Sequence, residues 1–159
     1  MSKNLRALSA HIIDNKLCRT EQIDSWVDSA RLRNEARNHG QFTQMFLVHS
    51  RCTMIIEGYA GDSRLLMAHI CAWLQDHDDV NERESYGLPD PDINVEMLDK
   101  SGRSHDVDIS VEFLEPVFVI PDTDGDIEWQ GRRWSIIDEP VVDVAEDGVV
   151  DVAEDGVVV

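Results

Sequence analysis

The sequence lacks several features that would assign it to a class of protein at once. It contains no run of about 18 apolar residues, so it predicts no membrane-spanning helix. It does not open on a charged segment followed by an apolar one, so we expect no export signal. The few cysteines form no close pair, which is typical of reduced thiols in a cytoplasm; they are Cys18, Cys52 and Cys71.

Signatures of enzymes and metal sites are also missing. No Walker A, G-x-G-x-x-G, G-x-S-x-G or H-E-x-x-H motif occurs, so we predict no enzymatic activity and no cofactor. The segment Asp122 to Asp126 resembles a calcium loop, but its glycine stands fourth rather than sixth, so we interpret it as a hairpin turn. A zinc site needs ligands at a characteristic spacing in the sequence. The soft ligands of this chain do not have that spacing; they are His49, Cys52, His69 and Cys71.

Positive charge is scarce. The chain has 14 Lys and Arg against 32 Asp and Glu, a formal net charge of -18. A surface this acidic repels phosphate, which disfavours sequence-tolerant binding of nucleic acid. Acidic residues dominate from Pro121 to Val159, whereas basic residues outnumber them in the first forty positions. This asymmetry fits head-to-tail contacts between copies, and an acidic solubilising tail fits it equally well.

The centre of the chain reads as a strand, a turn and a helix. Residues Gln44 to Glu57 are rich in β-branched and apolar side chains and contain neither Pro nor Gly, as in a strand. Tyr59-Ala60-Gly61-Asp62 follows as a turn, and Asp62 or Ser63 can cap a helix. One helical stripe then predicts packing against the strand: Leu66, Ile70, Trp73, Leu74 and His77.

Two segments precede this centre. Residues Lys3 to about Asn15 predict a helix with one apolar face. Residues 20–38 allow two interpretations. A short hairpin with its turn at Asp28-Ser29 fits this segment, and a helix, which the pattern slightly favours, fits the spacing of Ile23, Trp26, Val27 and Ala30.

Strands dominate the rest of the chain. Asp78 to Asp92 predicts a loop, and a hairpin follows from Ile93–Asp99 and Asp106–Phe113 around a turn at residues 100–103. The second of these strands turns one polar side to solvent or a partner. Further predicted elements are a strand at Pro116–Ile120 and a hairpin within Ile127–Ile137. The octad DVAEDGVV then occurs twice and predicts an extended or disordered tail, or edge strands added to a neighbour.

With these motifs in order, the chain resembles the tail completion protein R family of P2-like contractile-tailed phages. The resemblance covers about residues 3–121 and rests on Leu5-Arg6-Ala7-Leu8, Phe42, the Tyr59–Asp62 turn with Ala72-Trp73-Leu74, Met97-Leu98-Asp99 with Val107–Val111, and Val117-Phe118-Val119. Family members tend to have a hairpin where this chain has Ile23 to Ala36, which favours strands there. The extension from Trp129 to Val159 has no counterpart in this resemblance.

The resemblance implies a fold and a division of the chain. The fold is expected to be α/β (α+β) and similar to tail terminators, with a mixed, mainly antiparallel sheet and helices packed on one face. We expect such a domain at residues 1–121, a hairpin arm at 122–140 and a flexible acidic tail at 141–159.

The resemblance also implies a structural virion protein at the tail–neck junction, made in the host cytoplasm. Six copies would cap the tail tube and sheath, stop tail polymerisation and present a surface for head or neck joining, while DNA passes without specific binding. Contacts between unlike patches close into such rings. The candidate interface residues are Arg31, Arg33 and Arg51 on the basic side and Asp106, Asp108 and Glu112 on the acidic side. The alternatives are a head-side connector and an acidic DNA mimic.

Overall fold

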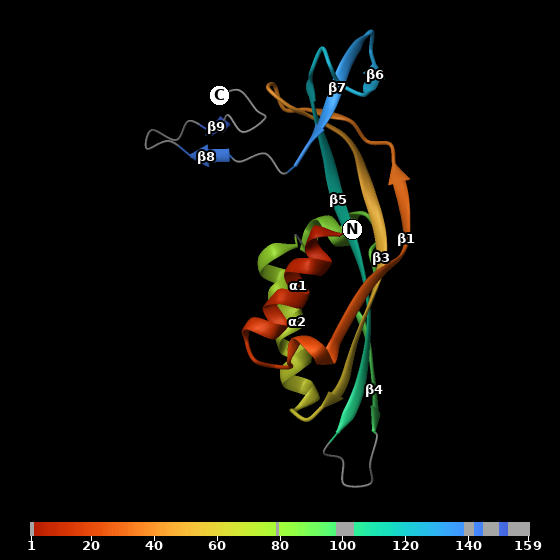
Figure 1. The fold of residues 1–159 in the computed structure, drawn as a ribbon, viewed down its shortest axis with the longest axis vertical. Coiled ribbons are helices and arrows are strands. Elements are labelled where there is room, and N and C mark those ends of the chain that lie inside the picture. Colours follow the sequence, from red (N-terminus) through yellow and green to blue (C-terminus); the bar gives the residue numbers. More distant parts are fainter. Residues whose placement is uncertain (1, 79, 98–103, 139–141, 145–149, 153–159) are drawn as a thin grey trace. The chain divides into compact units, whose positions relative to one another are not determined.

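The computed structural model describes residues 2–78, 80–97, 104–138, 142–144 and 150–152 (Figure 1). They belong to two compact units, described separately below: Met1–Arg31 with His49–Glu115, and Leu32–Val48 with Pro116–Val159. The elements are α1 (Lys3–Asp14), a 3-10 turn (Thr20–Gln22), β1 (Ile23–Arg33), β2 (Arg37–Asn38), β3 (Thr43–Tyr59), α2 (Ser63–His77), α3 (Val80–Ser85), β4 (Asp92–Met97), β5 (His105–Pro121), β6 (Ile127–Trp129), β7 (Arg132–Ile137), β8 (Val142–Val144) and β9 (Val150–Val152).

The fold is α+β, as the sequence predicts: a curled antiparallel sheet with two main helices packed on it. The sheet has seven strands in the order β1-β3-β5-β7-β6, with β2 paired to β3 and β4 paired to β5. Strands β8 and β9 pair only with each other. They lie in the region of the duplicated octads, most of which is outside the described residues.

The core of the first unit lies between one face of the sheet and the helices α1 and α2, which run side by side (Figure 1). Alternate residues of β3 and β5 face the helices because successive side chains of a strand point to opposite sides. The fully or almost fully buried side chains include Leu5, Leu8 and Ile12 of α1, Cys52, Met54 and Ile56 of β3, Leu66 and Ile70 of α2, and Val107, Ile109, Val111 and Phe113 of β5.

The predicted turn and cap before α2 are confirmed. The carboxylate of Asp62 accepts a hydrogen bond of 2.9 Å from the backbone N–H of Arg64, and the Tyr59 hydroxyl donates to the Asp62 carbonyl at 2.9 Å. Leu66, Ile70, Trp73 and Leu74 are buried as expected. His77, expected on the same stripe, is exposed; its ring stacks on Trp73 with centroids 4.9 Å apart.

Neither interpretation of residues 20–38 is correct in detail. The segment Ile23–Arg33 forms one continuous strand, β1, so the predicted helix and the turn at Asp28-Ser29 are both wrong. Ile23 and Val27 pack against the core, and polar residues alternate with them along the strand. The Thr53 hydroxyl of β3 donates a hydrogen bond to the carboxylate of Asp28. Pairing to β3 therefore overrides the helical spacing, because tertiary contacts decide weak local preferences.

The predicted β4–β5 hairpin is confirmed, and Ile93 lies opposite Ile109 in its register. Its turn at residues 100–103 lies outside the described residues. The separate strand expected at Pro116–Ile120 is instead the second half of β5. β5 pairs with β4 up to Ser110 and with β7 from Phe118, so Pro116, which has no N–H to donate, falls between the two ladders.

The segment between α2 and β4 is not only a loop. Residues Val80–Ser85 form the short helix α3, where the sequence predicts a polar, turn-rich connection. Residues 86–91 then lead to β4 and include the buried side chain of Leu88.

The second unit contains the predicted β6–β7 hairpin, whose strands pair from Ile127 opposite Trp134 to Trp129 opposite Arg132. The Asp122 carboxylate accepts hydrogen bonds from Asp124 N–H at 2.9 Å and from the Ser135 hydroxyl at 2.6 Å. A Cβ atom at Gly125 would lie 2.2 Å from the Trp134 carbonyl oxygen, so this close backbone approach requires glycine.

Candidate subunit interface

The sheet of the first unit has a face that α1 and α2 do not cover, which we call the open face. Its side chains alternate with the buried ones along each strand. They are Asp24, Trp26 and Asp28 of β1, His49, Arg51, Thr53, Ile55 and Glu57 of β3, Asp92, Asn94 and Glu96 of β4, and Asp106, Asp108, Ser110 and Glu112 of β5.

The open face is strongly acidic. Its carboxylates are Asp24, Asp28, Glu57, Asp92, Glu96, Asp106, Asp108 and Glu112, whereas Arg51 is the one basic residue among the described side chains named above besides His49. Glu96 stands directly opposite Asp106 in the β4–β5 register. Like charges directly opposite each other destabilise a sheet, so this face is not optimised for the stability of the isolated chain.

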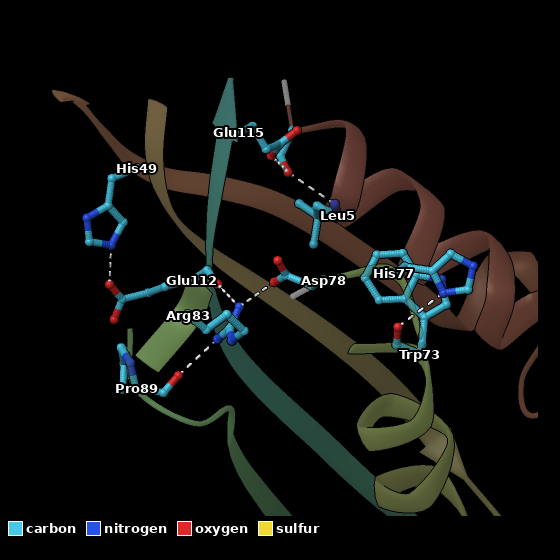
Figure 2. A network of polar contacts seen from close by, with 10 residues as sticks. Leu5, His49, Trp73, His77, Asp78, Arg83, Pro89, Glu112 and Glu115 are labelled. Atoms are coloured by element: carbon cyan, nitrogen blue, oxygen red, sulfur yellow. Dashed lines mark hydrogen bonds and ion pairs between the residues drawn. The ribbon is translucent and has the colours of Figure 1, made fainter. Parts of the chain in front are cut away.

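A small hollow of about 120 Å³ lies at one end of this surface, lined by Ser29, Arg31, His49, Arg51 and Glu112. His49 Nε2 lies 2.6 Å from Glu112 Oε1, and both side chains are 17% exposed (Figure 2). In contrast, Arg31 and Arg51 are exposed, and among the described residues neither makes an ion pair. The hollow therefore presents two available guanidinium groups to an acidic ligand.

The structure brings together three of the six candidate interface residues, Arg31, Arg51 and Glu112. Asp106 and Asp108 lie on the same side of β5 as Glu112 but up to six positions away, roughly 20 Å along an extended strand. Arg33, the sixth candidate, belongs to the second unit.

The two acidic candidates on β5 have different surroundings. Asp106 is half-buried, and its carboxylate accepts a hydrogen bond of 3.0 Å from the backbone N–H of Gly58. Asp108 is exposed opposite Asn94, and no partner of its side chain is found in the described part of the chain. Asp108 is therefore better placed than Asp106 to meet a partner.

Sequence reasoning missed Arg83, whose guanidinium makes a buried polar cluster. It donates to the Asp78 carboxylate at 2.7 Å, to the Glu112 carbonyl at 2.6 Å and to the Pro89 carbonyl at 3.0 Å (Figure 2). Arg83 thus fastens α3 and the segment before β4 to β5. No sequence pattern signals this role, since two of its three partners are backbone carbonyls, which every residue carries.

The remaining soft ligands are used in other ways. Burial raises the pKa of the Cys52 thiol to about 11, so this residue is a protonated core side chain near neutral pH. His69 Nδ1 lies 3.2 Å from His11 Nε2 across α1 and α2. Among the described residues, no group of three or more metal-binding side chains occurs. None of the described helices combines the length and apolar character needed to cross a membrane.

The family described as P2 phage tail completion protein R (GpR) matches residues 2–140. The chain belongs to this family. The match extends past residue 121, so it includes the β6–β7 hairpin, which the resemblance in the sequence did not cover; both copies of the octad lie beyond it. No curated protein and no solved structure gives a significant match.

Membership in the GpR family makes the chain a phage tail component, a structural protein of virion assembly rather than an enzyme. Its partners are therefore proteins of the tail.

Proposed function

We propose that this tail completion protein is a tail terminator. Six copies form a ring at the tail–neck junction that caps the tail tube and sheath, stops their polymerisation and presents a surface to the head or neck. Assembly takes place in the host cytoplasm. Family membership supports the tail location, and the uncovered acidic face of the sheet is the observation that favours a ring around DNA.

The acidic face suits the wall of a channel. DNA carries a dense row of phosphates, so carboxylates such as Asp24 and Asp28 repel it and let it pass without binding. A monomer that leaves one face of a sheet bare, with carboxylates Glu96 and Asp106 in direct opposition, has a surface arranged for use in an assembly.

Unlike patches supply the contacts between copies. The exposed guanidinium groups of Arg31 and Arg51, with Arg33 nearby in the sequence, form the basic patch. The acidic patch includes Asp106, Asp108 and Glu112 on β5. A contact between unlike patches is heterologous, and it closes into a ring when the rotation between neighbours permits.

The test is the mass of the purified full chain by light scattering, alone and with tail-tube subunits. We expect a species close to six times the 18.0 kDa of one chain, in solution or on the tube. Tubes capped in this way should also stop elongating when more tube subunits are added. A strict monomer that ignores tubes contradicts the proposal.

The acidic face also fits a second function, that of a DNA mimic that occupies a nucleic-acid-binding protein. A third function, that of a head-side connector, is compatible with a position at the tail–neck junction. A connector remains with purified heads rather than tails. A mimic binds a host protein as a monomer, and truncation after Pro140 removes acidic residues that would contribute to that binding. A terminator truncated there keeps its ring, because the strands and helices make the contacts.

A further inference from the structure

A groove of about 850 Å³ lies on the first unit between α2, α3 and the start of β4. Its floor is apolar and includes the buried side chains of Ile70, Leu74 and Leu88. Met67, which is 37% exposed, and the exposed thiol of Cys71 stand at its α2 side. The volume is in the range of sites that enclose a ligand, so the groove has room for an apolar side chain of a partner.

The wall formed by α3 and the following segment is held in place. Arg83, which lines the groove, is only 8% exposed and is bonded to Asp78 and to the carbonyls of Pro89 and Glu112 (Figure 2). Charge-assisted hydrogen bonds in a buried setting are strong and directional. The groove is therefore formed before any partner arrives, which lowers the entropic cost of binding.

The rim of the groove is acidic. Glu84, Asp90 and Asp92 line it and are exposed, and none of them makes an ion pair within the described part of the chain. An apolar floor inside an acidic rim favours a ligand with an apolar side chain flanked by cations, because complementary charge selects the partner and its orientation.

The chain itself carries such a ligand at the end of β1. Leu32 is 66% exposed, more than any other large apolar residue described, and it stands between Arg31 and Arg33 in the sequence. Contact of so exposed a leucine with water is unfavourable, so its burial in an apolar groove favours association.

We propose that Leu32 of one copy inserts into the groove between α2 and β4 of the next copy, and that the acidic rim attracts the basic segment around it. The contact joins two different surfaces, the end of β1 on one copy and the groove of the first unit on the next copy, so it is heterologous. This inference rests on the proposed ring and adds an apolar contact to the charged contacts proposed between its subunits.

Cysteine cross-linking tests the contact directly, because the groove already contains the exposed thiol of Cys71. In a Leu32→Cys variant, mild oxidation should join the new thiol to Cys71 of the next copy and give a ladder at multiples of 18.0 kDa on non-reducing gels. Cys18 and Cys52 are buried, at 8% and 0% exposed, so they remain unreacted.

Two matched variants control the experiment. Leu32→Cys combined with Cys71→Ser should give no ladder, because the second thiol is removed. Ile136→Cys places a thiol at another exposed apolar position, 61% exposed, and should also give none. A ladder in either control, or its absence in Leu32→Cys, overturns the contact.

Charge and mass readouts separate this contact from the ring itself. Leu32→Glu should reduce the ring to monomers, while Ile136→Glu should leave it intact. Arg31→Glu should weaken ring formation, and the double substitution Asp90→Arg, Asp92→Arg should restore it. If the wild-type chain forms rings and Leu32→Glu forms them too, the contact is wrong and the ring stands. If the wild-type chain forms no ring, both proposals fail. If Met67→Arg keeps the ring but loses the tail tube, the groove binds a tube segment instead, which also overturns the contact.

Discussion

The two faces of the first unit's sheet are made by alternate residues of the same strands, yet they differ in composition and packing. On the face covered by α1 and α2, β5 contributes Val107, Ile109, Val111 and Phe113, each at most 2% exposed. On the open face, the same strand contributes Asp106, Asp108, Ser110 and Glu112. One face holds the chain together, and the other carries charge that the isolated fold does not need.

This difference separates the residues that stabilise the fold from those that we propose act in assembly. Substitutions on the covered face should change the free energy of unfolding by the full cost of a cavity or a lost buried bond. Substitutions on the open face should change stability little or even raise it, while they alter contacts with partners. The predictions below test this separation.

The largest effect is expected for Trp73→Ala. Trp73 is 4% exposed, packs edge-on against Phe113 with centroids 6.3 Å apart, and stacks on His77. Its removal leaves a cavity beneath α2, so we expect a loss of about 3–5 kcal/mol in the free energy of unfolding, measured by denaturant titration.

Leu65→Ala is the matched control for this prediction. Leu65 lies on the same helix but is 51% exposed, so its truncation should cost within about 0.5 kcal/mol. Equal losses in the two variants would mean that α2 does not pack on the sheet through Trp73.

A smaller effect is expected for Glu115→Gln. The Glu115 carboxylate lies at the N-terminus of α1, where it accepts hydrogen bonds from the Ser2 hydroxyl and from Lys3 N–H at 2.8 Å. A negative charge there offsets the unpaired N–H groups of the first turn. We expect a loss of about 1 kcal/mol in unfolding experiments. Glu57→Gln, at an exposed position of β3, is the control. A comparable loss of stability in that variant would rule out a specific capping role for Glu115.

Periodicity predicted the covered face well. The period of two in β5 and the three- and four-residue spacing in α2 identified most of the core, because one apolar face is the dominant demand on both elements. β1 was harder to predict, since Ile23, Trp26, Val27 and Ala30 also match a helix. Its strand conformation depends on pairing with β3, which no local pattern records.

The candidate interface was predictable only in part. The acidic side of β5 follows from alternation, but the meeting of Arg31, Arg51 and Glu112 depends on the order in which three strands lie side by side. Arg83 was missed because it binds backbone carbonyls. The groove was missed as well, because its floor combines residues of α2 with Leu88, which lies in a segment that reads as polar loop.

The smallest and most diagnostic effect is expected on the open face, from Glu96→Lys. Glu96 stands opposite Asp106, so the substitution turns a like-charge pair into an attractive one and should raise stability by about 0.2–1 kcal/mol. The gain should shrink as salt is added, because these charges are near the surface and are screened. Glu96→Gln, which removes the repulsion without adding an attraction, should give an intermediate melting temperature. If Glu96→Lys instead destabilises the chain at low salt, the carboxylates of the open face already contribute to the stability of the monomer. The separation between a stabilising face and an assembly face would then fail.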